Sequence, residues 1–251
     1  MESETVNTET VKIEVMESVY ERNEKLAAEF NKKLDGRKIF CVNVMGGPGV
    51  GKTSSLEKII AGLDKPAFVI EGDIESDIDT RRLKAQGIRA AQINTGGNCH
   101  LDSPVVADAF EAALGSISAA APAAVPDTAS ATAPGPVKTA FSSGYLFIEN
   151  IGNLVCPAEF MIGEHIKLLI SAVTEGSDKP WKYPLAFEKA GIILLNKCDL
   201  LPYVDFDWDF FIEGVRKLNP SAPVIKVSAR TGEGYAEVIS WLETRAKPVL
   251  K

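Results

Sequence analysis

The residues with the clearest chemical role lie at positions 46–53, where the sequence reads GGPGVGKT. This run matches the phosphate-binding pattern G-x-x-x-x-G-K-[ST]. An apolar run over residues 39–45 precedes it, and apolar residues at helical spacing follow it from Leu56 onward. Glycines let backbone N–H groups curl around phosphate oxygens, and the helix adds its positive N-terminal end. A strand, this loop and a helix in that order favour a nucleotide site over a glycine-rich turn without a ligand.

Two side chains of the loop are expected to act on the phosphates. Lys52 would reach the β- and γ-phosphates, and Thr53 would bind Mg²⁺. The remaining phosphate contacts are expected from Gly46, Gly47, Gly49, Val50, Gly51 and Ser54.

A second motif, N-K-x-D, occupies residues 196–199 at the end of an apolar run. The carboxylate of Asp199 would accept hydrogen bonds from the N1–H and 2-amino groups of guanine, and adenine lacks that pair of donors. Asn196 would brace the loop, and the aliphatic stem of Lys197 would lie along the base.

Ser228 and Ala229 resemble the short loop that closes over guanine from the other side. The motif N-K-x-D alone is weak, but it follows a strand, comes after a P-loop and precedes this loop. The order of the three motifs therefore predicts GTP rather than ATP.

Acidic residues at strand ends are candidates for the magnesium site. Glu149 ends the apolar run 145–150 and would support Mg²⁺ or its water, and Asp73 is a second candidate. Gly152 matches the glycine whose backbone N–H senses the γ-phosphate in switch proteins. An ordinary cap or loop role is the alternative for each. With Lys52 and Thr53, Glu149 and Gly152 form the predicted catalytic set, and without an obvious water-activating base the turnover should be slow.

Three residues could bind a transition metal: Cys99, His100 and Cys156. Thiolate and imidazole ligands suit Zn²⁺ or Ni²⁺, whereas a lone buried cysteine is usually inert. Both segments follow predicted strands on the nucleotide side, which favours a metal site. The other two cysteines, Cys41 and Cys198, are interpreted as structural.

Strands and helices alternate along the chain, which predicts an α/β fold of the P-loop NTPase type. We expect a mostly parallel seven-stranded sheet flanked by helices. The predicted strands cover residues 39–45, 67–71, 90–94, 145–150, 166–173, 190–196 and 224–227. Helices are predicted at 77–85 and 101–114 and at the C-terminus. Because ligands of such sheets bind beyond the strand C-termini, the motifs should share one edge.

The domain organisation follows from composition. Residues 1–37 are predicted to form a disordered tail (1–10) and an amphipathic helix, and residues 38–251 a P-loop GTPase domain. The helix is indicated by apolar residues at steps of four and seven: Val15, Val19, Leu26, Phe30 and Leu34. Residues 115–143 are rich in Ala, Pro, Ser and Thr, which predicts a flexible low-complexity insertion. An interdomain linker or a docking segment are the alternatives.

Composition excludes several functional classes. The net charge of −7 disfavours a nucleic-acid binder. No stretch is long and apolar enough to span a bilayer, and the acidic N-terminus lacks signal-peptide features. The expected location is the cytoplasm, where the four cysteines would be reduced.

Several phrases together resemble the hydrogenase nickel-incorporation GTPases of the HypB family, which belong to the SIMIBI class. The match runs from about Leu26 to the last helix, excluding 115–143. The phrases are the P-loop, EGDI at 71–74, QINTG at 92–96, NCHLD at 98–102, ENIGNLVCP at 149–157 and NKCDL at 196–200. The NCH and NLVCP phrases are the specific part.

This resemblance implies a GTPase that dimerises in a GTP-dependent way and delivers nickel during [NiFe]-hydrogenase maturation. It implies GTP/GDP, Mg²⁺ and Ni²⁺ or Zn²⁺ as ligands, with Cys99, His100 and Cys156 near the subunit interface. It also implies a HypA-type nickel protein and the hydrogenase large subunit as partners. Some relatives carry an N-terminal C-x-x-C-G-C site or a His-rich stretch. This chain has neither and only two histidines, so nickel storage is not expected.

Two other functions fit parts of the pattern. Urease nickel-accessory GTPases share the fold, but their usual metal motif is Cys-Pro-His, whereas Cys99 and His100 are adjacent here. A GTP-gated binding module with incidental metal residues is the other alternative. Nickel affinity that depends on GTP would distinguish a metallochaperone from such a module.

Overall fold

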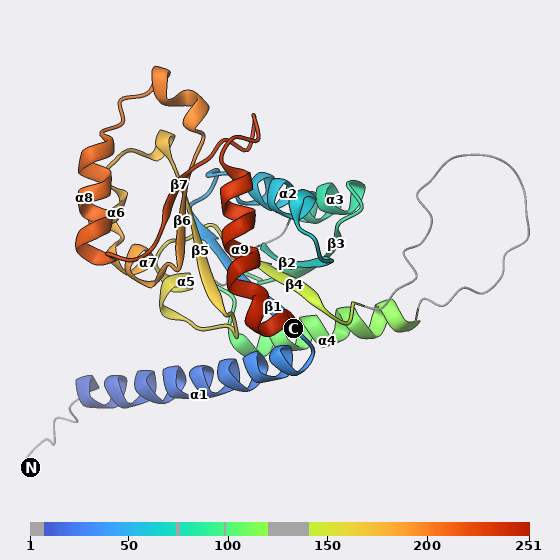
Figure 1. The fold of residues 1–251 in the computed structure, drawn as a ribbon. Helices are drawn as coiled ribbons and strands as arrows, with labels where there is room; N and C mark the ends of the chain where they lie inside the picture. The colour runs from blue at the N-terminus through green and yellow to red at the C-terminus, as the bar shows by residue number, and fades with distance from the viewer. Residues whose placement is uncertain (1–7, 74–75, 98, 120–140) are drawn as a thin grey trace, which may run out of the picture.

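Seven parallel strands form a single sheet in the computed structural model, which describes residues 8–73, 76–97, 99–119 and 141–251 (Figure 1). The strand order is β3-β2-β4-β1-β5-β6-β7, and all six pairings between the described strands are parallel. The predicted seven-stranded sheet is therefore confirmed. The strands are β1 Ile39–Gly46, β2 Ala67–Asp73, β3 Arg89–Asn94, β4 Gly144–Glu149, β5 Ile166–Ala172, β6 Ile192–Asn196 and β7 Val224–Lys226.

Helices cover both faces of this sheet. The longer helices are α1 Thr8–Gly36, α2 Lys52–Gly62, α3 Ile78–Ala85, α4 Ser103–Ala119, α8 Trp208–Leu218 and α9 Tyr235–Leu250. The shorter ones are α5 Cys156–Glu159, α6 Lys179–Lys182, α7 Pro184–Lys189 and the 3₁₀ turns η1 Val173–Glu175 and η2 Cys198–Tyr203. The sequence patterns did not indicate α5 to α8.

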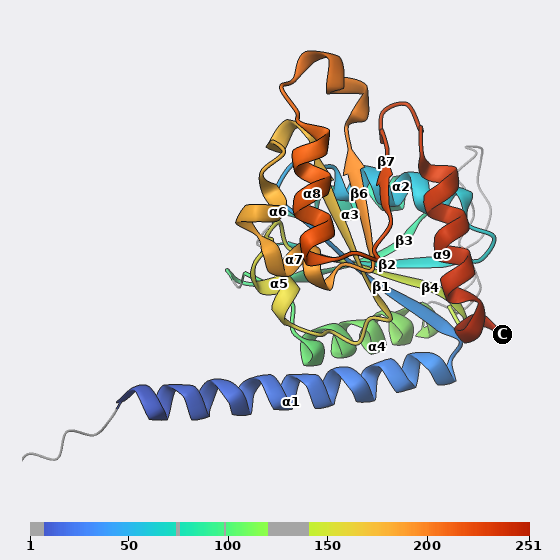
Figure 2. The ribbon, with the colours of Figure 1, turned by 60° about the vertical axis from the view of Figure 1, so that its left-hand side comes forward.

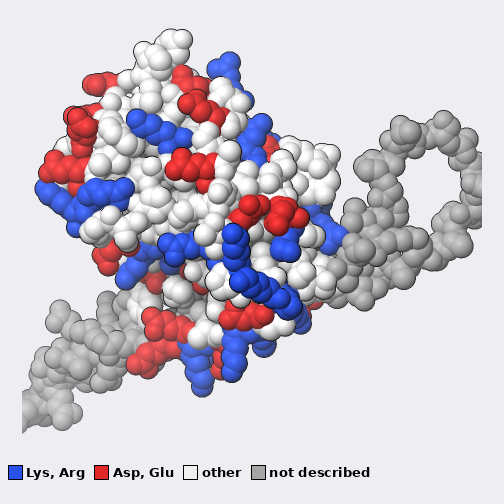
Figure 3. All heavy atoms as spheres, in the orientation of Figure 1, with Lys and Arg blue, Asp and Glu red and all other residues white. Residues whose placement is uncertain are grey.

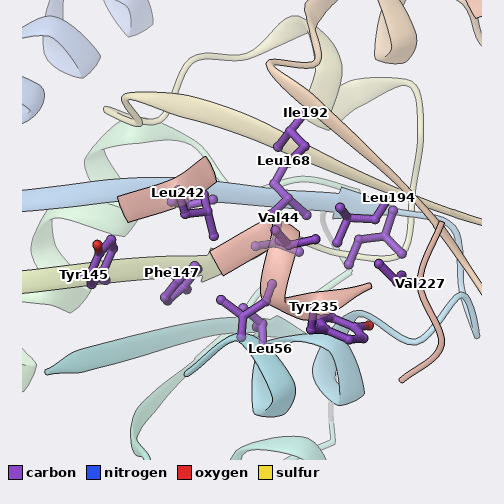
Figure 4. Packing of buried hydrophobic residues seen from close by; sticks show 14 of the residues in the cluster. Val44, Leu56, Tyr145, Phe147, Leu168, Ile192, Leu194, Val227, Tyr235 and Leu242 are labelled. Carbon is purple, nitrogen blue, oxygen red and sulfur yellow. The ribbon is translucent and has the colours of Figure 1, made fainter. Parts of the chain in front are cut away.

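Alternation along the strands divides the core between the two faces. Val42 and Val44 of β1 point toward α2 and α9, whereas Ile39 and Cys41 point toward α1 and α4. Figure 4 shows the first of these clusters, where Leu56 and Leu242 lie close to β1 and β4. A third cluster fills the space between β5, β6 and helices α7 and α8. Near-continuous burial of the strands is what a parallel sheet covered on both faces requires.

Helix α1 lies alongside α4 on one face of the sheet (Figures 1 and 2). Phe30 and Leu34 are buried there, and Phe30 meets the Phe110 ring edge-on at 5.9 Å between centroids. The predicted helix and its end near Gly36 are confirmed. Residues 8–10, expected to belong to a disordered tail, are helical instead, because α1 begins at Thr8. Residues 1–7 lie outside the described part of the chain.

Residues at both ends of the segment 115–143, predicted as a flexible insertion, belong to the described fold. Helix α4 continues to Ala119, whereas the pattern predicted its end at residue 114. Phe141 is buried against the rings of Phe68 and Phe110. Apart from Phe141 and the residues after it, the segment from 120 onward lies outside the described residues, as do Ile74 and Asn98 of the quoted phrases.

Two properties of the molecule bear on its partners. None of the helices that the structure describes is both long and apolar enough to cross a membrane. On the face shown in Figure 3, basic and acidic side chains are interspersed over the described residues. That part of the surface therefore lacks the continuous basic tract that binds a nucleic-acid backbone.

The topology also locates the ligand edge. Strand β1 lies between β4 and β5. The chain runs from β1 to β2 on the β4 side, and after β4 it crosses to β5 on the other side of β1. Ligands of open parallel sheets bind beyond the strand C-termini at such a switch point. The loop 46–53 begins at the end of β1 and leads into α2.

Candidate nucleotide and metal sites

The loop after β1 has the geometry of a phosphate cradle. Gly51 precedes α2 with φ +93°, and a Cβ there would lie 2.6 Å from Nδ2 of Asn196, so only glycine fits. The Nζ of Lys52 donates to the carbonyl oxygens of Gly46 at 3.4 Å and Gly47 at 3.3 Å. Burial lowers the pKa of Lys52, and the nearby carboxylate of Glu149 opposes that change. The ammonium group of Lys52 therefore points into the phosphate loop, toward the carbonyl oxygens of Gly46 and Gly47.

Thr53 and Glu149 meet at the base of the cradle. Thr53 Oγ1 donates a 2.9 Å hydrogen bond to Oε1 of Glu149. The other carboxylate oxygen, Oε2, is buried and makes no hydrogen bond among the described residues. Burial raises the pKa of Glu149 to about 7, although Lys52 and Thr53 lower it. A buried carboxylate oxygen without a donor, beside a hydroxyl, fits the oxygen ligands that Mg²⁺ prefers.

Other acidic residues contribute to the field around Lys52. Asp73, at the end of β2, raises the pKa of Lys52, and so do Asp79 and Glu175. The structure thus places Asp73 near the cradle, as the sequence predicted. The sequence patterns missed Asp79 and Glu175, because Asp79 lies on a helix and Glu175 in a short turn after β5. Position beyond the C-terminal end of a central strand was the available signal for Glu175.

The N-K-x-D loop is tied directly to the phosphate loop. Nδ2 of Asn196 donates to the carbonyl of Val50 at 2.8 Å, and its Oδ1 accepts from the N–H of Ala229 at 3.0 Å. Asn196 therefore braces three loops, as expected. Lys197 adopts a left-handed conformation with φ 62°, and Oδ1 of Asp199 accepts a 2.7 Å hydrogen bond from Ser228 Oγ.

These loops enclose a cavity of about 540 Å³. The predicted residues Gly51, Ser54, Asn196, Lys197, Asp199 and Ala229 line it. Arg82 and Arg230 also line it, and neither was recognised from sequence. Arg230 Nη1 lies 3.8 Å from Oδ2 of Asp199, and its position directly after Ala229 was the available signal. A carboxylate oriented by a hydroxyl in a cavity of this size can pair with the donors of a guanine base.

The segment after Glu149 packs on the phosphate loop. A Cβ at Gly152 would lie 3.1 Å from Cγ of Pro48, so a larger residue would push the two segments apart. Asn153 forms an isolated antiparallel bridge with Gly46. Gly152 therefore lies beside the loop, where the sequence placed a phosphate-sensing glycine.

Cys99, His100 and Cys156 come together although 57 residues separate the two cysteines. Their ligand atoms all lie within 4.8 Å of one another. The two Sγ atoms are 3.1 Å apart, and Cys99 Sγ is 3.6 Å from Nδ1 of His100. The His100 ring stacks on Phe160 at 4.1 Å between centroids. Two thiols and an imidazole at this spacing fit one tetrahedral thiophilic ion such as Zn²⁺ or Ni²⁺.

Contacts within the cluster and burial shift the pKa values of its groups. The pKa of Cys156 is raised by its hydrogen bond to Cys99 and by burial, so a bound metal ion would displace the thiol proton. Burial lowers the pKa of His100, which favours the neutral imidazole that binds metals. The other cysteines stay outside the cluster: Cys41 is fully buried in β1, and Cys198 Sγ donates to the carbonyl of Leu195 at 3.0 Å.

The comparisons with known proteins agree with this geometry. Residues 40–226 match the family model described as CobW/HypB/UreG, nucleotide-binding domain. The hydrogenase maturation factor HypB of Azotobacter chroococcum mcd 1 is 42% identical over 233 residues, covering 92% of this chain and 68% of that protein. HypB of Escherichia coli K12 is 40% identical over 235 residues, with 93% and 72% covered. The solved structure of Helicobacter pylori HypB in complex with nickel superposes with a TM-score of 0.78, 29% identity and coverage of 92% and 97%.

Proposed function

Since the chain belongs to the HypB branch of the CobW/HypB/UreG family, we propose that it is a GTP-dependent nickel chaperone. It would hydrolyse GTP slowly and couple that cycle to nickel delivery for [NiFe]-hydrogenase maturation. One observation carries the proposal. The segment 149–156 begins at Glu149, hydrogen-bonded to Thr53, and ends at Cys156, 3.1 Å from Cys99. Nucleotide chemistry at one end can therefore change the thiol cluster at the other.

Different residues of the nucleotide site would bind the base, the phosphates and the magnesium ion. Asp199, oriented by Ser228 and braced through Asn196, would select guanine. Lys52 and the backbone N–H groups of the loop would stabilise the charge that develops on the transferring phosphoryl group. Thr53, Glu149 and Asp73 would hold Mg²⁺, which would neutralise charge that develops on the phosphates. Slow turnover suits this set, which orients the phosphates without a dedicated base.

The thiol cluster would carry the cargo ion. Cys99, His100 and Cys156 give three ligands, one fewer than a closed tetrahedral site needs. A two-fold dimer repeats each ligand across its axis, so a GTP-dependent homodimer would complete a shared site. The family also leads us to expect a HypA-type nickel protein and the hydrogenase large subunit as partners.

The test combines hydrolysis and metal binding on purified protein. Phosphate release from GTP should be slow and should fall to background in Lys52→Ala, because the phosphoryl group loses its main cation. Isothermal titration with Ni²⁺, repeated with Zn²⁺, should give different affinities in GDP and in a non-hydrolysable GTP analogue. The proposal fails if GTP is not hydrolysed or if the metal affinity is the same with both nucleotides.

A further inference from the structure

Asn153 lies at the junction between the phosphate loop and the metal cluster. Its backbone pairs with Gly46, the residue at which β1 enters the phosphate loop. The preceding Gly152 lies so close to Pro48 that a Cβ would be 3.1 Å from the proline ring. A shift of the phosphate loop is therefore transmitted to the backbone of Asn153 by direct contact.

The side chain of Asn153 reaches both cysteine-bearing segments. Nδ2 donates to the carbonyl oxygen of Cys99 at 3.2 Å, and Oδ1 accepts from the N–H of Val155 at 2.9 Å. Val155 immediately precedes Cys156. The short side chain of asparagine carries both a donor and an acceptor, whereas a carboxylate offers only acceptors. Asparagine can therefore hold both segments at once.

We propose that Asn153 is the positioning residue that couples nucleotide state to metal affinity, an inference that rests on the proposed function. When the γ-phosphate moves the Gly152 backbone, Asn153 shifts with it and changes the spacing between Cys99 and Cys156. Both ligands then bias one shared element, which is the physical condition for coupling between sites. The coupling is reciprocal, so bound metal changes nucleotide affinity by the same factor.

A second asparagine provides a matched control. Asn23 of α1 joins the chain shortly after Cys99 to the chain shortly after Cys156. It accepts from the N–H of Ser103 at 3.1 Å and donates to the carbonyl of Met161 at 2.7 Å. Neither partner belongs to the phosphate loop. Because Asn23 lies on α1 and contacts neither the phosphate loop nor the segment 149–156, its loss should affect both nucleotide states alike.

The experiment measures the ratio of nickel dissociation constants in GDP and in a non-hydrolysable GTP analogue, using full-length protein. In the wild type we expect this ratio to depart from one by roughly fivefold or more. Asn153→Ala should bring it close to one while the thiolate-to-nickel charge-transfer band remains. Asn153→Asp should also bring the ratio close to one, because the carboxylate cannot donate to the carbonyl of Cys99. This variant replaces the alanine variant in the test if the latter does not fold. Asn23→Ala should weaken nickel binding in both states and keep the ratio.

The outcomes separate the two proposals. A wild-type ratio of one refutes the nucleotide-gated chaperone itself. A state-dependent wild type together with an unchanged ratio in both Asn153 variants refutes the role of Asn153 alone. Asn150 would then be the next candidate for coupling the nucleotide site to the metal site, because its Oδ1 accepts from the N–H of Leu101 at 3.4 Å. Nucleotide affinities measured with and without Ni²⁺ must show the same factor, since linkage requires it.

Discussion

Thr53 and Glu149 form a buried hydrogen bond of 2.9 Å across 96 residues of chain, between the start of α2 and the end of β4. This bond satisfies one oxygen of Glu149 and leaves Oε2 buried without a donor among the described residues. Keeping that carboxylate ionised without a cation is costly. The pair thus links stability, pH and the binding of a magnesium–nucleotide complex.

The first prediction concerns pH. The pKa of Glu149 is raised from 4.5 to about 7, so the folded state holds the proton more tightly than the unfolded chain. Stability from this group is complete below pH 4.5 and is lost as the pH rises through about 7. Relative to Glu149→Gln, the nucleotide-free protein should lose about 2.5 kcal/mol of unfolding free energy between pH 5 and pH 8. Urea unfolding at several pH values measures this difference.

Magnesium and nucleotide provide the control for that experiment. Because they stabilise the ionised carboxylate, adding both should remove most of the pH-dependent difference between the wild type and Glu149→Gln. Parallel profiles of the two proteins without ligand would show that the carboxylate does not titrate in this range.

The second prediction concerns base selection. Asp199→Asn should weaken GTP binding by roughly 2–4 kcal/mol, because the donors of guanine lose their charged acceptor. Binding of xanthosine triphosphate should improve, since the amide can donate to its additional carbonyl. Competition binding with GTP, ATP and xanthosine triphosphate measures both effects, and Asp209→Asn, at an exposed position of α8, is the control. Equal affinity of the wild type for ATP and GTP would contradict the guanine assignment.

Local patterns in the sequence predicted most of the fold. The phosphate loop, the N-K-x-D loop and the strands before them each carry their signal within a few residues, and parallel topology then places their ends at one edge. Helix α8 was missed although its start signal is local. The side chain of Asp207 caps the N–H of Phe210 at 2.9 Å, and Phe211 is buried one residue further on.

Tertiary contacts account for what the sequence could not predict. Phe141 follows a low-complexity segment and looks like a loop residue, yet it fills the space beside Phe110. Asn153 and Asn23 are ordinary polar residues in sequence, and their role depends on partners 54 and 80 residues away. No short-range spacing encodes such hydrogen bonds.

The third prediction concerns the Pro/Ala segment. Replacing residues 122–138 with a short Gly/Ser linker should leave the melting temperature and GTP affinity unchanged, because the segment contains little apolar surface to bury. Phe141→Ala should instead cost about 3–5 kcal/mol, because it removes a buried ring that contacts Phe68 and Phe110. Thermal melts of the two variants compare these effects. A large loss in the linker variant would show that the segment contributes to the folded domain.

The last prediction concerns the shared metal site and dimerisation. Cys156 is the ligand nearest in sequence to the phosphate-contacting segment, and its Sγ lies 3.1 Å from that of Cys99. Cys156→Ala should therefore bind nickel more weakly and lose its dependence on nucleotide, while GTP affinity stays nearly unchanged because the side chain lies outside the nucleotide cavity. Cys198→Ala is the matched control, since its thiol donates to the carbonyl of Leu195 and lies outside the metal cluster.

Sedimentation of both variants and the wild type, with and without Ni²⁺ in each nucleotide state, tests this mechanism. If two subunits complete one coordination sphere, GTP and Ni²⁺ should shift the wild type and Cys198→Ala toward the dimer. In Cys156→Ala, GTP alone should still promote association, but Ni²⁺ should add nothing, because a ligand is missing on each side of the axis. A wild type that stays monomeric with GTP and Ni²⁺ would rule out the shared site. So would a Cys156→Ala variant whose nickel affinity equals that of the wild type.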